Sequence, residues 1–233
     1  MEREMTDKKI SIVIPCFNEE LLIEKCILQI LSIKESNLKI QIIAVNDNSN
    51  DGTSKILEKY RNKIEIINNK RNYGKGYSVK TGCKKAEGDY ICIYDADLEY
   101  DIKDYLRIIK DMEKNDVIFG IGTRYINNKN KDGFVHTKLN YIYNRLFETK
   151  LGKKLNDVNC CVKIYKKEIN CDIVNNIEKN KFQYDTEIMT YILKNNIRYK
   201  EYEVSYKPRN RKQGKKINIK NYIECFYYLI TGK

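Results

Sequence analysis

Negative charge is concentrated in the stretch IYDADLEYD, residues 93–101. Its acids are Asp95, Asp97, Glu99 and Asp101, spaced two residues apart. They follow the apolar run Tyr90 to Tyr94, which lacks polar alternation and so predicts a strand covered on both faces. Asp95 and Asp97 on the turn after that strand could share one hard cation such as Mg²⁺, which prefers oxygen ligands. A D-x-D triplet alone is weak evidence for a metal site, because a chain with 32 acids can contain one by chance. The surrounding sequence must therefore show whether the triplet is functional.

Short apolar runs alternate with helical patterns through the first half of the chain. The expected strands are 10–14, 40–45, 64–67, 90–94 and 117–121, and the expected helices are 20–33, 53–60, 77–86 and 102–114. This alternation predicts βαβ units and an α/β fold with a mainly parallel sheet. Right-handed crossovers then place every strand-to-helix loop along one edge, where open α/β sheets bind ligands.

Five polar loops follow these strands, so their side chains should meet at that edge. The loops are PCFNEE (15–20), NDNSNDGT (46–53), NKRNYGKGYS (69–78), DADLE (95–99) and GTRY (122–125). Helix capping by Asn or Asp explains one such residue in each loop. It does not explain why an Asp pair, a Gly-Lys-Gly and a D-x-D share one edge. We therefore predict a ligand site there.

The second half of the chain predicts further helices and a basic segment. A helix expected over 134–150 carries one apolar stripe, which suits a core position or, alternatively, a membrane interface. A strand is expected over 198–204 and an amphipathic helix at the C-terminus. Between them, residues 207–220 contain seven Lys or Arg and no acid. We expect one catalytic domain over 1–206, with 207–233 forming a basic loop and a helix packed on it.

The composition indicates a globular protein rather than a disordered one. The 233 residues are 42% hydrophobic and 33% charged, with a net charge of +12. Such a surplus favours anionic partners, although a general lysine bias could also produce it. No RNP-type, zinc-finger or basic-zipper pattern is present, so nucleic acid is not an expected partner.

Cysteine usage and hydropathy predict the compartment. The eight cysteines include no C-x-x-C pair, and Met1 to Lys9 show no signal peptide, so we expect reduced thiols and a cytoplasmic location. No apolar run approaches the roughly 20 residues that cross a bilayer. If the protein meets a membrane, it should lie on the surface.

Seven segments resemble, in order, family 2 glycosyltransferases of GT-A fold, and among them the polyprenyl-phosphate (dolichyl-phosphate) hexose synthases. They are IVIPCFNEE, VNDNSNDGT, RNYGKGYSVKTGCKKAEGDYICIYDAD, GTRY, DVNCCVKIYKKE, DTEI and VSYKPRNRKQGKKI. The resemblance implies an inverting, metal-dependent enzyme. Its donor would be a nucleotide sugar of the UDP-glucose or GDP-mannose class, and its acceptor a polyprenyl phosphate.

The resemblance also implies roles for individual residues. The nucleotide would be bound by Pro15, Phe17, Glu19 and Asp47, with Gly74, Lys75 and Gly76 beside them. Asp95 and Asp97 would hold Mg²⁺ or Mn²⁺, with Asp97 closest to the ion. Glu99 stands where similar enzymes carry Gln, which adds charge to the metal site and leaves the choice of metal open.

The acceptor decides which further side chains are needed. A hydroxyl of a saccharide or lipid-linked glycan, the alternative acceptor, needs a general base, for which Asp185 and Glu187 are candidates. A phosphate monoester has a second pKa near ~6 and needs no base. It needs a cationic cradle instead, for which the candidates are Arg124, Lys207, Arg209, Arg211, Lys215 and Lys216.

Three further expectations concern Asp157, His136 and the C-terminal segment. Asp157 could position the acceptor or cap a turn. His136, the only histidine, is expected on a surface loop rather than in catalysis. Basic residues beside an amphipathic helix predict peripheral attachment to an anionic membrane surface.

Overall fold

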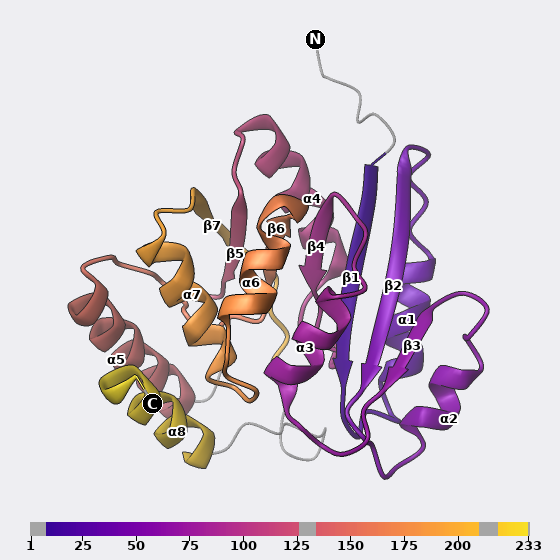
Figure 1. The fold of residues 1–233 in the computed structure, drawn as a ribbon, viewed down its shortest axis with the longest axis horizontal. Coiled ribbons are helices and arrows are strands. Elements are labelled where there is room, and N and C mark those ends of the chain that lie inside the picture. The colour runs from indigo at the N-terminus through magenta and orange to yellow at the C-terminus, as the bar shows by residue number, and fades with distance from the viewer. Residues whose placement is uncertain (1–7, 126–133, 210–218, 233) are drawn as a thin grey trace.

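Seven strands form one mixed sheet with helices on both faces (Figure 1). The computed structural model describes residues 8–125, 134–209 and 219–232. The strands are β1 Lys8–Cys16, β2 Leu38–Asn46, β3 Glu65–Asn68, β4 Tyr90–Ile93, β5 Phe119–Thr123, β6 Lys163–Lys166 and β7 Tyr199–Glu203. The helices are α1 Ile23–Leu31, α2 Thr53–Glu58, α3 Lys75–Cys83, α4 Ile102–Lys114, α5 Phe134–Leu151, α6 Asn170–Asn176, α7 Tyr184–Lys194 and α8 Ile219–Thr231, with a 3₁₀ turn at Lys167–Ile169.

The sheet has the order β3-β2-β1-β4-β6-β5-β7. Strands β3, β2, β1 and β4 are parallel to one another, as are β5 and β7. Only β6 runs antiparallel, between β4 and β5. The predicted α/β fold with a mainly parallel sheet is confirmed. Strand β6 was not predicted, because four residues that begin and end with lysine carry little strand signal.

The core lies in two layers, one on each face of the sheet. Alternate residues of β1 supply both: Ile12 and Ile14 belong to the layer that includes α1 and α4, whereas Val13 belongs to the layer that includes α3 and α7. The first predicted helix begins at Ile23, later than expected, while α4 has the predicted bounds. Asp101 caps α4 by accepting a hydrogen bond from Lys103 N at 2.9 Å.

The C-terminal helix α8 packs against α5 at the end of the second layer (Figure 1). Cys225 and Leu229 of α8 are buried in that layer, and the ring of Phe226 meets Tyr143 of α5 edge to face. All eight cysteines are free, and seven are buried. Within the described ranges, no helix has the length and apolarity needed to cross a bilayer.

Candidate active site

The polar loops converge on one cavity of about 500 Å³ at the carboxyl ends of the strands. Its walls include Pro15, Phe17 and Glu19 after β1, Asp47 after β2, Gly74 and Lys75 after β3, Asp95, Asp97 and Glu99 after β4, and Arg124 after β5. Asp185 at the start of α7 and Arg209 after β7 complete this part of the wall. The sequence-based expectation that these loops share one edge therefore agrees with their placement.

Arg209 lies among three carboxylates of the cavity. Its Nη2 is 2.9 Å from Asp97 Oδ2, its Nη1 is 3.3 Å from Glu19 Oε2, and its Nε is 3.6 Å from Glu99 Oε1. The backbone N–H of Arg209 also donates to Glu99 Oε1 at 2.9 Å. The start of the basic segment is thus bound to the acidic loop after β4.

The surroundings of Asp97 favour its protonated form. Burial raises the pKa of its carboxyl, and the charges of Asp95 and Glu99 raise it further. The guanidinium of Arg209 acts in the opposite direction, and the resulting pKa is about 7. A divalent cation beside Asp97 would therefore stabilise the ionised form of this carboxyl.

The side chains after β4 suit a hard divalent ion by chemistry and by charge. Asp95, Asp97 and Glu99 present carboxylate oxygens, which Mg²⁺ and Mn²⁺ prefer. The described residues contain no group of three acidic, His or Cys side chains already arranged around a metal position. Instead Lys75 Nζ lies 3.0 Å from Asp95 Oδ2, and Arg209 contacts the other two carboxylates. A metal ion held here would replace these cations.

Asp47 is held by the loop that follows β3. Its Oδ1 accepts hydrogen bonds from Asn69 Nδ2 at 2.7 Å and Tyr73 N at 3.0 Å, and its Oδ2 accepts from Gly74 N at 2.7 Å. The carboxylate therefore fixes the loop that carries Lys75, while still lining the cavity.

Two glycines flank Lys75 and allow α3 to approach the chain before α7. Gly74 has a positive φ of 101°, which favours glycine. A Cβ on Gly76 would lie 2.6 Å from Lys179 O and 2.7 Å from Tyr184 Cβ. Gly76, unlike Gly74, is not one of the residues that line the cavity. Both glycines thus act by packing, which brings Lys75 to the cavity wall.

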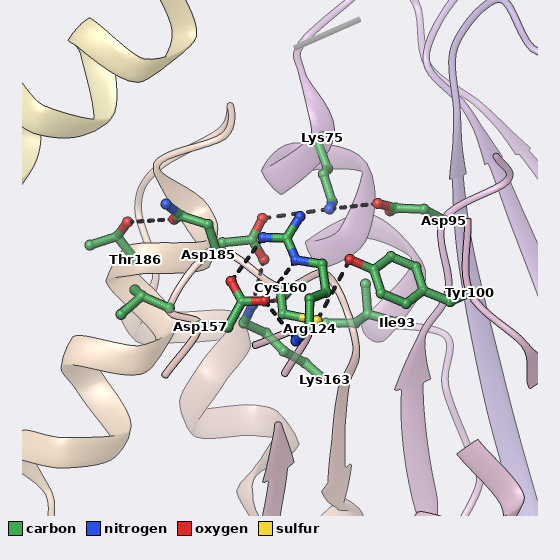
Figure 2. A network of polar contacts seen from close by, with 12 residues as sticks. Lys75, Ile93, Asp95, Tyr100, Arg124, Asp157, Cys160, Lys163, Asp185 and Thr186 are labelled. Carbon is green, nitrogen blue, oxygen red and sulfur yellow. Dashed lines mark hydrogen bonds and ion pairs between the residues drawn. The ribbon is translucent and has the colours of Figure 1, made fainter. Parts of the chain in front are cut away.

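A chain of alternating charges runs inward from the acidic loop (Figure 2). Lys75 Nζ lies between Asp95 Oδ2 at 3.0 Å and Asp185 Oδ2 at 3.5 Å. The other oxygen of Asp185 is 2.7 Å from Lys163 Nζ, and Lys163 is fully buried. Burial alone would raise the pKa of the Asp185 carboxyl, but the ammonium groups of Lys163 and Lys75 outweigh it and lower that pKa.

Lys163, which contacts the wall residue Asp185 from outside the cavity, is a residue that the sequence-based reasoning missed. It stands inside the apolar run from Cys160 to Tyr165, where an isolated lysine is unusual, and that placement was the available signal. Its partner Asp185 was predicted as a candidate base, but a carboxylate held between two ammonium groups is a weak proton acceptor.

Arg124 and Asp157 form a forked, buried ion pair (Figure 2). Arg124 Nε donates to Asp157 Oδ2 at 2.7 Å and Nη2 donates to Oδ1 at 2.8 Å, while the backbone N of Arg124 donates to Oδ2 at 3.1 Å. The guanidinium also lies 5.1 Å from the ring centroid of Tyr206. Asp157 therefore orients Arg124 at the cavity wall, from a position just behind it.

The remaining predicted residues lie elsewhere. Glu187 is outside the cavity wall and accepts a hydrogen bond from Lys179 N at 2.7 Å. Lys207 is also outside the cavity wall, and its backbone N–H donates a hydrogen bond to Glu99 O at 2.8 Å. Arg211, Lys215 and Lys216 lie outside the described residues. His136 is not on a loop: it stands in the first turn of α5, 3.3 Å from the hydroxyl of Tyr222 in α8.

Helices α5 and α8 contribute polar wall residues that were not predicted. They are Asn140 of α5, and Asn221, Tyr222 and Glu224 of α8. Glu224 accepts a hydrogen bond from Gln183 Nε2 at 3.3 Å, and within the described ranges it makes no ion pair. A sequence pattern marks such helices as amphipathic but does not say which polar side chains turn toward a cavity.

A family model described as glycosyl transferase family 2 matches residues 11–174, which is most of the chain. That range contains the loops after β1 to β5 and the antiparallel strand β6.

Several curated proteins are similar over longer stretches. Undecaprenyl-phosphate 4-deoxy-4-formamido-L-arabinose transferase of Photorhabdus laumondii is 29% identical over 234 residues, covering 96% of this chain and 67% of the relative. Dolichyl-phosphate beta-glucosyltransferase of Dictyostelium discoideum is 27% identical over 215 residues, covering 84% and 66%. Dodecaprenyl-phosphate galacturonate synthase of Rhizobium johnstonii is 29% identical over 174 residues, covering 69% and 48%. The chain thus spans about half to two thirds of the length of these relatives.

Solved structures share the fold at low sequence identity. Glucosyl-3-phosphoglycerate synthase from Mycobacterium tuberculosis in complex with UDP aligns with a TM-score of 0.71 and 14% identity, covering 96% of this chain and 79% of that one. S. aureus TarS 1-349 aligns with a TM-score of 0.59 and 20% identity, covering 83% and 58%.

Proposed function

Because the chain belongs to glycosyl transferase family 2 and has the GT-A fold, we propose that it moves a hexose from a nucleoside-diphosphate sugar to a polyprenyl phosphate. The transfer would invert the anomeric carbon, depend on a divalent metal and take place at a membrane surface. One observation carries this proposal: the acids after β4, Lys75 after β3 and Arg124 after β5 line the same cavity. In that arrangement the acids could bind a metal ion, and Lys75 and Arg124 could bind phosphate groups.

The donor side of the cavity is the edge formed by the loops after β1 to β4. Pro15, Phe17, Glu19 and Asp47 line it and would contact the base and ribose of a donor of the UDP-glucose or GDP-mannose class. Mg²⁺ or Mn²⁺ at Asp95, Asp97 and Glu99 would supply charge stabilisation for the departing diphosphate. The side chains of Lys75 and Arg209 also line the cavity, and their positive charges would stabilise the same phosphates.

The state of Asp185 supports a phosphate acceptor. A hydroxyl acceptor needs a base, whereas a phosphate monoester is already ionised near neutral pH. Both oxygens of Asp185 are engaged by lysines, so this carboxylate is poorly suited to take a proton. The names of the three curated relatives each contain a polyprenyl or dolichyl phosphate, which supports the same class of acceptor here.

Contact with a bilayer is supported by an apolar face on α5 and α8. Tyr141, Ile142 and Leu146 of α5, and Ile223, Tyr227 and Ile230 of α8, are exposed. Lys138, Arg145 and Lys150 are exposed on the same helix α5, which gives the face a basic rim suited to anionic lipid. The opposite side of α8 lines the cavity, so one helix separates this face from the candidate acceptor site.

Glu224 favours a second candidate, transfer to a hydroxyl of a saccharide. The other acidic wall residues contact lysine, arginine or, for Asp47, backbone N–H groups. Glu224 has a neutral partner, Gln183, in the described part of the chain, and so could act as a general base. Glu224→Gln should abolish hydroxyl transfer and spare phosphate transfer.

The deciding experiment measures release of UDP or GDP by the full chain. The protein is incubated with Mn²⁺ or Mg²⁺, UDP-glucose or GDP-mannose, and either a short polyprenyl phosphate or a free oligosaccharide. We expect release that requires the polyprenyl phosphate and stops when the metal is chelated. Release with the oligosaccharide alone would favour the second candidate, and release that persists in excess chelator would refute the metal-dependent mechanism.

A further inference from the structure

Of the lysines that the structure describes, Lys163 alone is buried. It is the first residue of β6, in the middle of the sheet between β4 and β5. Its ammonium group donates to Cys160 O and to Asp185 Oδ1, the latter at 2.7 Å. A lysine in such a place needs a compensating charge, and Asp185 supplies it.

Asp185 connects this buried lysine with the cavity (Figure 2). Its second oxygen lies 3.5 Å from Lys75 Nζ, which in turn lies 3.0 Å from Asp95 Oδ2. Lys75 is therefore shared between two acids, and the shorter contact is the one to the acidic loop. If Lys163 were neutral, Asp185 would have Lys75 as its only nearby counter-ion and would draw the Lys75 amine away from Asp95.

We propose that Lys163 is a positioning residue: it fixes the Asp185 carboxylate, which holds the Lys75 amine at the part of the cavity wall that meets the donor's diphosphate. The proposal rests on the proposed function, because that function makes Lys75 a phosphate ligand. In this arrangement Asp185 remains ionised and does not exchange a proton during the reaction. The lowered pKa of Asp185 agrees with that role, since the carboxylate stays charged at neutral pH.

The test compares variants that separate stability from positioning. Lys163→Met keeps the apolar stem but leaves Asp185 buried with one partner, so this variant should lose thermal stability. Lys163→Met combined with Asp185→Asn removes both charges and should regain most of it. The matched control is Lys166→Met on the same strand, which removes the ion pair with Asp116 at 2.7 Å, outside the cavity wall.

Two measurements on the double variant report whether the Lys75 amine has moved. The first is the dissociation constant for UDP or GDP with Mn²⁺, which we expect to rise roughly tenfold because the amine has lost its anchoring carboxylate. The second needs no nucleotide: limiting acetic anhydride should label Lys75 severalfold faster, as mapped by mass spectrometry. Lys166→Met should match the wild-type protein in both.

A stable double variant with wild-type affinity and wild-type labelling of Lys75 would overturn the proposal, because Lys163 would then serve stability alone. If the wild-type protein bound neither UDP nor GDP, the proposed function would fail. The labelling of Lys75 would still decide whether Lys163 and Asp185 position that amine.

Discussion

At the scale of single residues, the cavity is a set of acids matched with cations. Arg209 contacts Asp97, Glu19 and Glu99, and Lys75 contacts Asp95. Desolvation makes uncompensated charge costly in such a place, so these four carboxylates each lie beside a lysine or arginine. A metal ion bound at these carboxylates, as we propose, would have to displace the lysine and arginine groups.

Asp97→Asn should lower sugar transfer by about 100-fold or more, because it removes a charged metal ligand where negative charge develops. The control is Asp101→Asn in the same stretch, which keeps a good N-cap for α4. Release of nucleoside diphosphate measures activity, and Mn²⁺ binding measures the site itself. Normal turnover in the Asp97→Asn protein would contradict the assignment of the metal site.

The pH dependence of stability can be predicted at Asp111. Burial tends to raise the pKa of this carboxyl, but hydrogen bonds from Lys200 and Tyr202 lower it below its ordinary value of 3.8. The unfolded chain then binds more protons than the folded one below that value, so the free energy of unfolding falls as the pH decreases. In Asp111→Asn, thermal melts between pH 6 and pH 3 should show a smaller loss of Tm. An unchanged slope would show that Asp111 does not contribute.

At the scale of elements, short polar loops after parallel strands are positioned by the packing of the helices that follow them. Gly74 and Gly76 let α3 touch the backbone of Lys179 and Asn180, and Tyr77 N donates to Asn180 O at 3.1 Å. Lys75 lies between the two glycines. The position of its amine thus depends on contacts between α3 and the start of α7.

Gly76→Ala should weaken the protein and its binding of the donor together. The added methyl group would overlap Lys179 O and Tyr184 Cβ, at a cost of about 1–3 kcal/mol in the free energy of unfolding. Chemical denaturation and nucleotide binding measure the two effects. Lys84→Ala, at the exposed residue directly after the same helix, should change neither. If Gly76→Ala bound nucleotide normally, the contact between α3 and α7 would not govern the site.

At the scale of the whole molecule, α5 and α8 carry an exposed apolar face, and the opposite side of α8 forms part of the cavity wall. A surface that is apolar at its centre and basic at its rim matches the boundary of an anionic bilayer. Sugar transfer to a lipid-bound phosphate would need this proximity, since the polyprenyl chain stays in the membrane.

Ile223→Ser combined with Tyr227→Ser should reduce binding to vesicles that contain phosphatidylglycerol by about tenfold or more, because two apolar side chains no longer enter the lipid. Leu28→Ser, an exposed apolar residue of α1 on another part of the surface, is the matched control. Co-sedimentation at low and high salt measures binding, and salt should weaken it. Equal binding by both variants would exclude this face as the membrane contact.

The sequence by itself determined the α/β fold, the loops at the carboxyl edge and the acids after β4. These features are local: strands and helices follow from the spacing of apolar residues, and the right-handed crossover places the loops. Only the tertiary structure decided the charge pairs. Arg209 meets Asp97, 112 residues away, and Lys163 meets Asp185 across 22 residues. Such pairs depend on how β6 inserts into the sheet and on how the chain after β7 returns to the acidic loop, and neither is encoded in the periodicity of any single segment.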